Sequence, residues 1–551
     1  MTWVQEYNPL GSIGLSALVA AIPLFLLLYM LGVKRVKGHI AAAVGVTSAV
    51  LVAIIVWKMP VSLAVSATLN GALYGIFPIV WIVVTAIWVY NMSVESGEFE
   101  IIKNSLASIT DDRRLQALFI AFAFGSFIEG TAGFGTPVAI TAAMLVGLGF
   151  NPIYAAGICL IANTAPVAFG AIGIPIVVAA QVSSLDIMKI SQVVGRQLPF
   201  LSLLVPLWLV VTMCGWKRAM EVLPAVLVAG ICFAGTQFLT SNYVNAYLPD
   251  ITSAIVTIVG LLIFLKFWKP VKVWHFPDEK PAAGGKVQLK YSTGEVLRAW
   301  GPYLILALLV FLWADDRFLK FKLTLLKIDQ LNPLFLISWP GLDGLIQKAP
   351  PVVAKASAYP AKYMVNLLSA AGSAIFISGL LSVLIIPNYS FGRAFSCLGR
   401  TIVQLRFPIG TIAMILGLAY IMNYSGMSST LGLAFTATGA VFPFFAPILG
   451  WLGVFLTGSD TSANALFGSM QKTAAEQIGV DPHLTVAANS SGGVTGKMIS
   501  PQSISVATAA TGLVGEEGTI FRFTVLHSLA MLLFMSVLTL LQAYALHWML
   551  P

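Results

Sequence analysis

Three ionisable residues lie in apolar parts of this sequence, where charged side chains are rare: Glu129, Asp460 and Lys497. An uncompensated charge deep in a membrane costs about 2.5–3.5 kcal/mol even on insertion scales, so such residues are candidates for function. A carboxyl group whose pKa is raised by removal from water can exchange a proton when another molecule binds. We predict that Glu129 or Asp460 accepts a proton, and that Lys497 either balances Asp460 or contacts a bound carboxylate.

Two of these residues also have simpler interpretations. Asp460 could cap a helix by accepting hydrogen bonds from backbone N–H groups. Lys497 could lie at a membrane surface, with its aliphatic part in lipid and its ammonium group in water. We interpret His39 as an interfacial surface residue, because it follows the basic segment 34–37 at the end of an apolar run.

The two acidic residues belong to two similar segments rich in glycine and hydroxyl residues, 125-GSFIEGTAGFGTP-137 and 453-GVFLTGSDTSANA-465. Each is followed by an apolar stretch that is interrupted at an asparagine, Asn163 or Asn489, and at the same offset of 326 residues Pro175 matches Pro501. Paired interruptions in corresponding positions of two halves are typical of the binding site of a secondary transporter.

The interruptions predict broken helices whose backbone N–H groups and polar side chains bind a small carboxylate. Each free helix N-terminus favours an anion by about 0.3–1 kcal/mol. We expect the helices to unwind at Asn163-Thr164 with Pro166, and at 489-NSSGG-493. Packing of helices through small residues is the alternative for these segments. The candidate substrate-binding residues are Gly130, Thr131, Gly133, Gly135, Thr136, Asn163, Thr164, Gly458, Ser459, Thr461, Ser462, Asn489, Ser490, Ser491 and Lys497.

The elements that position these residues are predicted to be membrane helices. Of the 551 residues, 58% are hydrophobic and only 10% charged, which indicates an all-α polytopic membrane protein. About twelve spans are expected, with two re-entrant hairpins at 115–149 and 443–480. The spans are expected near 11–33, 39–57, 71–92, 153–183, 198–214, 219–239, 249–267, 299–314, 366–387, 408–424, 484–513 and 522–549.

Hydrophilic connections divide the chain into a first half at 1–267, a middle part at 268–365 that surrounds one span, and a second half at 366–551. Basic residues fall into alternate connections, which places the N- and C-termini outside the cell and makes the two halves an inverted repeat. The loop at 315–365, with its several prolines, is expected to be a loop or peripheral lid. The basic residues of the connections that are expected to face the cytoplasm are Lys34, Arg35, Lys37, Arg113, Arg114, Lys217, Arg218, Lys266, Lys269, Lys272, Arg393, Arg400 and Arg406.

Several other classes of protein are disfavoured. The net charge of +9 lies in short connections and indicates membrane topology rather than a nucleic-acid partner. The four cysteines are scattered without metal or disulfide spacing. We find no nucleotide-binding fingerprint and no metal-ligand spacing, so we expect neither an enzyme nor a cofactor or metal site.

The strings 129-EGTAGFGTPVAIT-141, 161-IANTAPVAFGAIGIPI-176, 451-WLGVFLTGSDTSANALF-467 and 489-NSSGGVTGKMISPQS-503 closely resemble those of bacterial L-lactate permeases, the lactate/glycolate:proton symporter family. The resemblance covers essentially the whole chain. It implies uptake of L-lactate, and also of D-lactate and glycolate, by proton symport across the inner membrane. The expected partners are therefore a small monocarboxylate, a proton and membrane lipid. A sodium-coupled carrier for small carboxylates stays open as the alternative.

Overall fold

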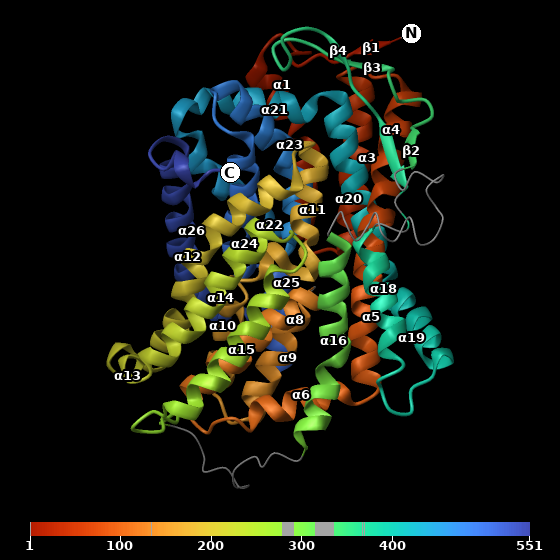
Figure 1. The fold of residues 1–551 in the computed structure, drawn as a ribbon. Helices are drawn as coiled ribbons and strands as arrows, with labels where there is room; N and C mark the ends of the chain where they lie inside the picture. The colour runs from red at the N-terminus through yellow and green to blue at the C-terminus, as the bar shows by residue number, and fades with distance from the viewer. Residues whose placement is uncertain (1, 134, 278–290, 315–334, 366, 368–369) are drawn as a thin grey trace.

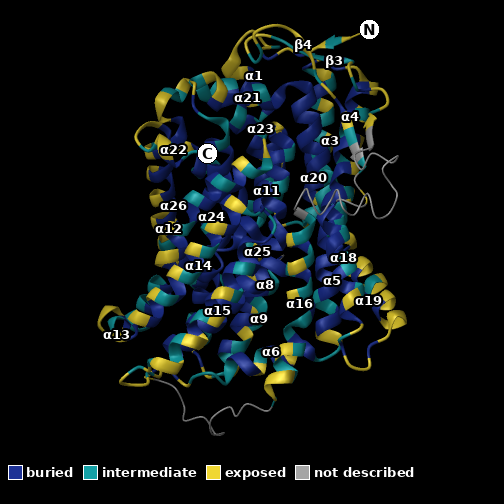
Figure 2. Cartoon of the chain, viewed as in Figure 1, coloured by how far each residue is buried: buried dark blue, intermediate teal, exposed yellow. Residues whose placement is uncertain are grey.

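The computed structural model describes residues 2–133, 135–277, 291–314, 335–365, 367 and 370–551. Long helices run between two ends of the molecule (Figure 1): one end carries the strand β1, and the other carries the helices α6, α13 and α19. Large apolar side chains such as Phe25, Ile55 and Leu526 are exposed on the outer helices, as expected of surfaces that face lipid. Buried residues fill the centre of the helix bundle (Figure 2). The chain is therefore a polytopic α-helical membrane protein.

Within the described residues, nine helices are long and apolar enough to cross a membrane, or up to eleven if each of two bent pairs counts as one span. The predicted number of about twelve is therefore not confirmed. One reason is that the predicted span at 366–387 contains a helix of only 12 residues, Ala371–Ser382, and residues 366, 368 and 369 lie outside the described part. Another is that the polar helix Pro482–Lys497 is not apolar enough to count as a span.

The first part of the chain forms the elements from β1 to α6. They are β1 (Trp3–Val4), α1 (Ile13–Ala20), α2 (Ile22–Gly32), α3 (Gly38–Ile55), α4 (Val61–Tyr74), a short π-helical segment (Gly75–Val80), α5 (Trp81–Glu95) and α6 (Glu98–Ala107).

Two helical hairpins form where predicted. The first comprises α7 (Arg113–Gln116), a π-helical segment (Ala117–Phe124), α8 (Gly125–Thr131) and α9 (Thr136–Gly147). The second comprises α22 (Phe442–Thr457) and α23 (Asp460–Ile478). Their turns contain Gly135 and Gly458, with φ of +83° and +71°, a backbone conformation that glycine adopts without strain. These turns place the residues at the hairpin tips inside the protein.

A broken helix follows each hairpin. The first comprises α10 (Pro152–Ala162), a 3₁₀ turn (Val167–Phe169) and α11 (Gly170–Ser183), with a bend of 63°, so the break predicted at Asn163–Pro166 is confirmed. The second comprises α24 (Pro482–Lys497) and α25 (Pro501–Thr511). The prediction of unwinding at 489–493 is wrong, because that segment is helical within α24, and the break lies just before Pro501.

The two sets of elements are arranged in opposite directions. Helices α10 and α11 run toward the end that carries β1, whereas α24 and α25 run away from it (Figure 1). Helix α11, after the first break, packs against α23, the returning arm of the second hairpin. Correspondingly, α25, after the second break, packs against α9, the returning arm of the first hairpin. This exchange of partners is the geometry expected of an inverted repeat.

The remaining helices surround these elements. In the first part of the chain they are α12 (Ile187–Cys214), α13 (Trp216–Met220), α14 (Leu223–Tyr243), α15 (Pro249–Phe267) and α16 (Thr293–Ala314). In the second part they are α18 (Ala371–Ser382), α19 (Phe391–Gln404), α20 (Arg406–Ser425), α21 (Met427–Phe435), a 3₁₀ turn (Thr436–Val441), α26 (Glu517–Tyr544) and a final 3₁₀ turn (His547–Met549).

Short strands in the loop before α18 cover one end of the bundle. They are β2 (Phe335–Ser338), β3 (Ile346–Lys348), β4 (Ser357–Ala358) and β5 (Lys362–Val365). Strand β3 pairs in parallel with β1 and antiparallel with β4, whereas β2 pairs antiparallel with β5. We call the described residues 335–365 of this loop the cap.

Basic segments gather at the opposite end. The Arg114 guanidinium donates hydrogen bonds to the carbonyl oxygens of Arg218 and Lys272, each at 2.8 Å, and pairs with Asp112 and Glu221, each at 2.7 Å. Three connections that the charge count placed on one side of the membrane therefore meet in space.

Candidate functional site

A cavity of about 610 Å³ lies between the tips of the two hairpins. Both predicted carboxylates and the predicted lysine line it, although they come from three elements far apart in the sequence: Glu129 from α8, Asp460 from α23 and Lys497 from the end of α24. All three side chains are buried. We call this the central cavity.

Glu129 and Lys497 form an ion pair, with 2.9 Å between Lys497 Nζ and Glu129 Oε1. The second carboxylate oxygen accepts a hydrogen bond from the Asn163 side-chain amide at 2.9 Å. Gly170 permits this arrangement, since a Cβ atom there would lie 2.6 Å from Glu129 Oε1. Two alternatives were expected for Lys497, that it balances Asp460 or that it contacts a bound carboxylate; its ion pair is instead with Glu129 of the opposite hairpin, and the second alternative stays a prediction. The ion pair also places Lys497 in the interior rather than at a membrane surface.

Asp460 is held by side chains of α23 and α24. One of its oxygens accepts hydrogen bonds from the Ser490 hydroxyl and, at 3.4 Å, from the Asn464 amide. The other oxygen has no hydrogen-bond partner among the described residues. The helix cap is supplied by Ser459, whose hydroxyl accepts a hydrogen bond from the Ser462 N–H at 3.2 Å. The alternative role of Asp460 as the capping residue is therefore wrong, and Asp460 is a buried residue of the cavity wall.

The other predicted residues fall into two groups. Those that line the central cavity are Gly133, Gly135, Gly458, Ser459, Thr461 and Ser462. Those that are not among its lining residues are Gly130, Thr131, Thr136, Asn163, Thr164, Asn489, Ser490 and Ser491. Within the second group, Asn163 and Ser490 still contact the two acidic residues directly, as described above.

Asn489 belongs to a chain of side-chain amides. It donates a hydrogen bond to Asn464 Oδ1 at 2.9 Å and accepts one from Gln471 Nε2 at 3.1 Å. Asn464 in turn donates to the carbonyl oxygen of Pro175 at 3.1 Å, in the broken helix of the other half. The amides thus connect the second hairpin to both broken helices, which is a positioning role rather than direct contact with the cavity.

Sequence reasoning missed several residues. Gln502, Ser503 and Ser505 of α25 also line the central cavity. They follow Pro501, and the signal that could have found them is the break that this proline marks. Asp250, at the start of α15, is 1% exposed, and neither of its carboxylate oxygens has a hydrogen-bond partner among the described residues.

Asp250 lies directly behind the first hairpin. A Cβ atom on Gly130 would be 2.8 Å from the Asp250 Cβ, so the glycine next to Glu129 permits close contact with α15. An ionised carboxylate without hydrogen bonds or a counter-ion is strongly disfavoured in such a place. The residue adds a third buried acidic group close to the ion pair.

Basic residues line the part of the central cavity that leads away from the hairpin tips. Arg35 and Lys37 are exposed, and His39 is partly buried, with its ring stacked on Phe407 at 4.6 Å between centroids. His39, interpreted from the sequence as an interfacial surface residue, is partly exposed, and it also lines the cavity. This wall gives that part of the cavity a positive charge, which attracts anions.

The arrangement can bind a small anion and exchange a proton. An anionic carboxylate that enters the cavity can accept hydrogen bonds from Lys497 and from the hairpin hydroxyl groups, and it competes with Glu129 for the ammonium group. Within the described part of the chain, no three His, Cys, Asp or Glu residues are close enough together to hold a metal ion.

Similar proteins indicate the family of this chain. Residues 16–546 match the L-lactate permease family. The chain is 52% identical to the glycolate permease GlcA of Escherichia coli K12, over 99% of this chain and 98% of the relative. It is 50% identical to the L-lactate permease of the same organism and 47% identical to that of Bacillus subtilis, each over the full length of both chains.

Among solved structures, the chain is similar to MtrF of Neisseria gonorrhoeae, with a TM-score of 0.50 and 11% identity, over 94% of this chain and 97% of that one. At this identity the likeness shows the fold alone. The family match and the full-length relatives lead to one conclusion: the chain belongs to the L-lactate permease family.

Proposed function

We propose that this protein carries lactate, glycolate and similar small monocarboxylates together with protons into the cell across the bacterial inner membrane. The observation that supports this most strongly is the buried Glu129–Lys497 ion pair in the central cavity. A cation that can receive a carboxylate lies there beside a carboxylate that can receive a proton. The relatives named as L-lactate and glycolate permeases support the substrate class.

Coupling follows from competition for Lys497. In this structure the ammonium group is paired with Glu129. When the substrate carboxylate takes over Lys497, Glu129 loses its counter-ion in a buried position, and protonation becomes the favourable way to remove its charge. Substrate and proton then bind together, and release of one favours release of the other. This role in proton coupling is proposed for Glu129 first, with Asp460 as a second carboxylate that can take up a proton.

The proposed substrate-binding residues divide by distance from the cavity. Lys497, Ser459, Thr461 and Ser462, with the backbone at Gly133, Gly135 and Gly458, line the central cavity and contact the substrate. Asn163, Asn489 and Ser490 position the cavity residues through hydrogen bonds. The other proposed residues, which do not line the cavity, are Gly130, Thr131, Thr136, Thr164 and Ser491. The halves 1–267 and 366–551 each supply one hairpin and one broken helix, and 268–365 connects them.

The positive-inside rule gives the proposed orientation. The end with α6, α13 and α19 carries the basic connections and faces the cytoplasm, so both termini and the cap face the periplasm. The exposed basic residues of the central cavity, Arg35 and Lys37, belong to a cytoplasmic connection in this orientation. The structure is then an inward-facing state.

Counterflow and gradient-driven uptake in proteoliposomes test this function. We expect exchange of lactate and glycolate, accumulation driven by an inward proton gradient, and no dependence on sodium. Glu129→Gln should abolish uphill accumulation and retain exchange, because the amide keeps the shape of the side chain but does not release a proton. Undiminished accumulation by this variant would contradict the role of Glu129, and a requirement for sodium would support the sodium-coupled alternative.

A further inference from the structure

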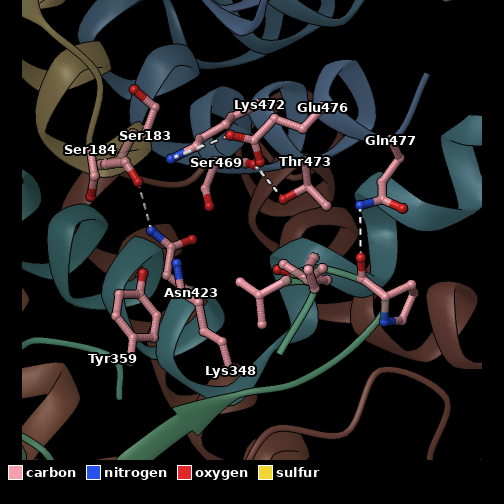
Figure 3. Close-up of a pocket in the computed structure, with 16 residues that line it drawn as sticks. Ser183, Ser184, Lys348, Tyr359, Asn423, Ser469, Lys472, Thr473, Glu476 and Gln477 are labelled. Atoms are coloured by element: carbon pink, nitrogen blue, oxygen red, sulfur yellow. Dashed lines mark hydrogen bonds and ion pairs between the residues drawn. The ribbon is translucent and has the colours of Figure 1, made fainter. Parts of the chain in front are cut away.

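A second cavity, of about 470 Å³, lies at the end of the molecule that carries the cap. Its walls come from the ends of α11 and α23, from α20 and from the cap, and they are rich in polar side chains (Figure 3). None of its lining residues lines the central cavity. We call it the outer cavity.

Two lysines enter the outer cavity from different elements. Lys472 comes from α23 and Lys348 from β3 of the cap, and Figure 3 shows the two side chains approaching from opposite sides. The Lys348 ammonium group lies 4.0 Å from the centroid of the Tyr359 ring, and no carboxylate of the described residues is within ion-pair distance of it. Burial, and then the neighbouring Lys472, lower the pKa of Lys348.

The acidic residue of this cavity balances only part of the positive charge. Glu476 is the carboxylate in its lining, and it lies 3.8 Å from Lys472, one helical turn away on the same helix. A pair at this distance with partly exposed partners contributes little, about 0–1 kcal/mol. The cavity therefore has excess positive charge and room for an anion that contacts both lysines.

The outer cavity and the central cavity lie along the same two helices. Helix α11 contributes Ala171 and Pro175 to the central cavity and Ser183 to the outer one. Helix α23 contributes Asp460 to the central cavity and Lys472 to the outer one. At 1.5 Å per residue, the separation along α23 is about 18 Å. A ligand that left one cavity between these helices would arrive in the other.

Close packing separates the two cavities in this state. A Cβ atom on Gly468 of α23 would lie 2.8 Å from the Val182 side chain of α11. The Asn423 amide of α20 donates a hydrogen bond to the carbonyl oxygen of Val182 at 3.1 Å, and Gln477 donates to the carbonyl oxygen of Pro351 in the cap at 3.0 Å. Opening a path between the cavities would require α11 and α23, which are in extensive contact, to move apart.

We propose that the outer cavity is a capture site for small carboxylate anions, in which Lys348 and Lys472 bind the substrate before it passes between α11 and α23 to the central cavity. This inference rests on the proposed function. The two lysines attract the anion through the cap side, and the polar lining replaces part of its hydration. The site is distinct from the Glu129–Lys497 site, which carries the coupling.

The test is uptake of radiolabelled lactate by intact cells at several ionic strengths. Lys348→Gln and Lys472→Gln should each raise KM about three- to ten-fold with little change in maximal rate, because the lost charge slows capture rather than translocation. Lys348→Arg should restore the KM. Lys355→Gln is the matched control, since it removes a positive charge from the exposed part of the same loop outside the cavity.

The dependence of the KM on ionic strength gives a second test of the capture site. Screening should raise the KM of the unaltered protein as ionic strength increases, and the Lys348→Gln variant should depend less on salt. Maximal counterflow at saturating lactate shows that each variant folds. If Lys348→Gln and Lys472→Gln both have the same KM as Lys355→Gln, the proposal of a capture site is wrong, whereas the proposed transport function is not affected. If the unaltered protein does not transport lactate, the proposed function itself fails.

Discussion

The Glu129–Lys497 ion pair has a measurable consequence for stability. Removing one partner of a buried pair typically destabilises a protein by about 3–5 kcal/mol, because the other charge stays buried without compensation. We expect Lys497→Met to lower the unfolding temperature of the purified protein markedly. The double variant Glu129→Gln with Lys497→Met should recover most of this loss, although it should not accumulate lactate.

A surface lysine provides the control for this comparison. Lys103 pairs with Glu100, whose side chain is 60% exposed, so Lys103→Met should change stability by no more than about 1 kcal/mol. If Lys497→Met unfolded at the same temperature as Lys103→Met, the proposed contribution of the Glu129–Lys497 ion pair to stability would be contradicted. If the double variant is stable but does not accumulate lactate, the ion pair has a role in coupling that is separate from its role in stability.

The sequence identified single residues better than it identified their partners. Glu129, Asp460 and Lys497 stand out because charge is rare in apolar sequence. Their pairing depends on tertiary structure, since Lys497 and Glu129 are separated by 368 positions. Asp250 was missed because an acidic residue at the start of a predicted span is ordinarily at the membrane surface. Only the packing of α15 against Gly130 shows that it is buried.

Among the helices, the contact between α22 and α24 explains why the predicted break at 489–493 was wrong. The small residues of this segment indicated unwinding, but they allow two helices to approach closely instead, which was the alternative interpretation. A Cβ atom on Gly492 would overlap the backbone of Pro447, including its carbonyl oxygen. The first break was predictable because Asn163 and Pro166 coincide with it, whereas the second depends on Pro501 and the packing of α24.

This helix contact gives the next prediction. Gly492→Ala should destabilise the protein by about 1–3 kcal/mol, because neither backbone can move away without displacing the second hairpin. Gly235→Ala in α14 is the control, since a Cβ atom there meets nothing within 4 Å. It should leave stability unchanged or raise it slightly, by up to about 1 kcal/mol. Thermal unfolding in detergent measures both, and equal unfolding temperatures would contradict the close contact.

For the whole molecule, composition predicted the class, the repeated motifs predicted the two hairpins, and the alternation of basic residues between connections predicted the inverted arrangement. The number of spans was less predictable, because hydropathy does not distinguish a short apolar helix such as α18 from a complete span, and because the span expected at 484–513 is divided into the polar helix α24 and the short helix α25. The pairing of the N-terminal strand β1 with β3 of the cap was also beyond the sequence, since it joins segments more than 300 residues apart.

The charge balance of the whole carrier leads to the last prediction. In the proposed mechanism the substrate carboxylate takes the place of the Glu129 carboxylate as the partner of Lys497, and one proton neutralises Glu129. The net charge of these groups is therefore the same with and without bound substrate. Transport should then be electroneutral and independent of the membrane potential. If net charge moved, the potential would contribute about 2.3 kcal/mol per charge per 100 mV. In proteoliposomes, a potential set by potassium and valinomycin should not drive lactate accumulation at equal pH, whereas a gradient of about one pH unit should support up to about ten-fold accumulation. Accumulation driven by the potential alone would mean that a second proton moves with each substrate, and Asp460→Asn should then remove the response to potential.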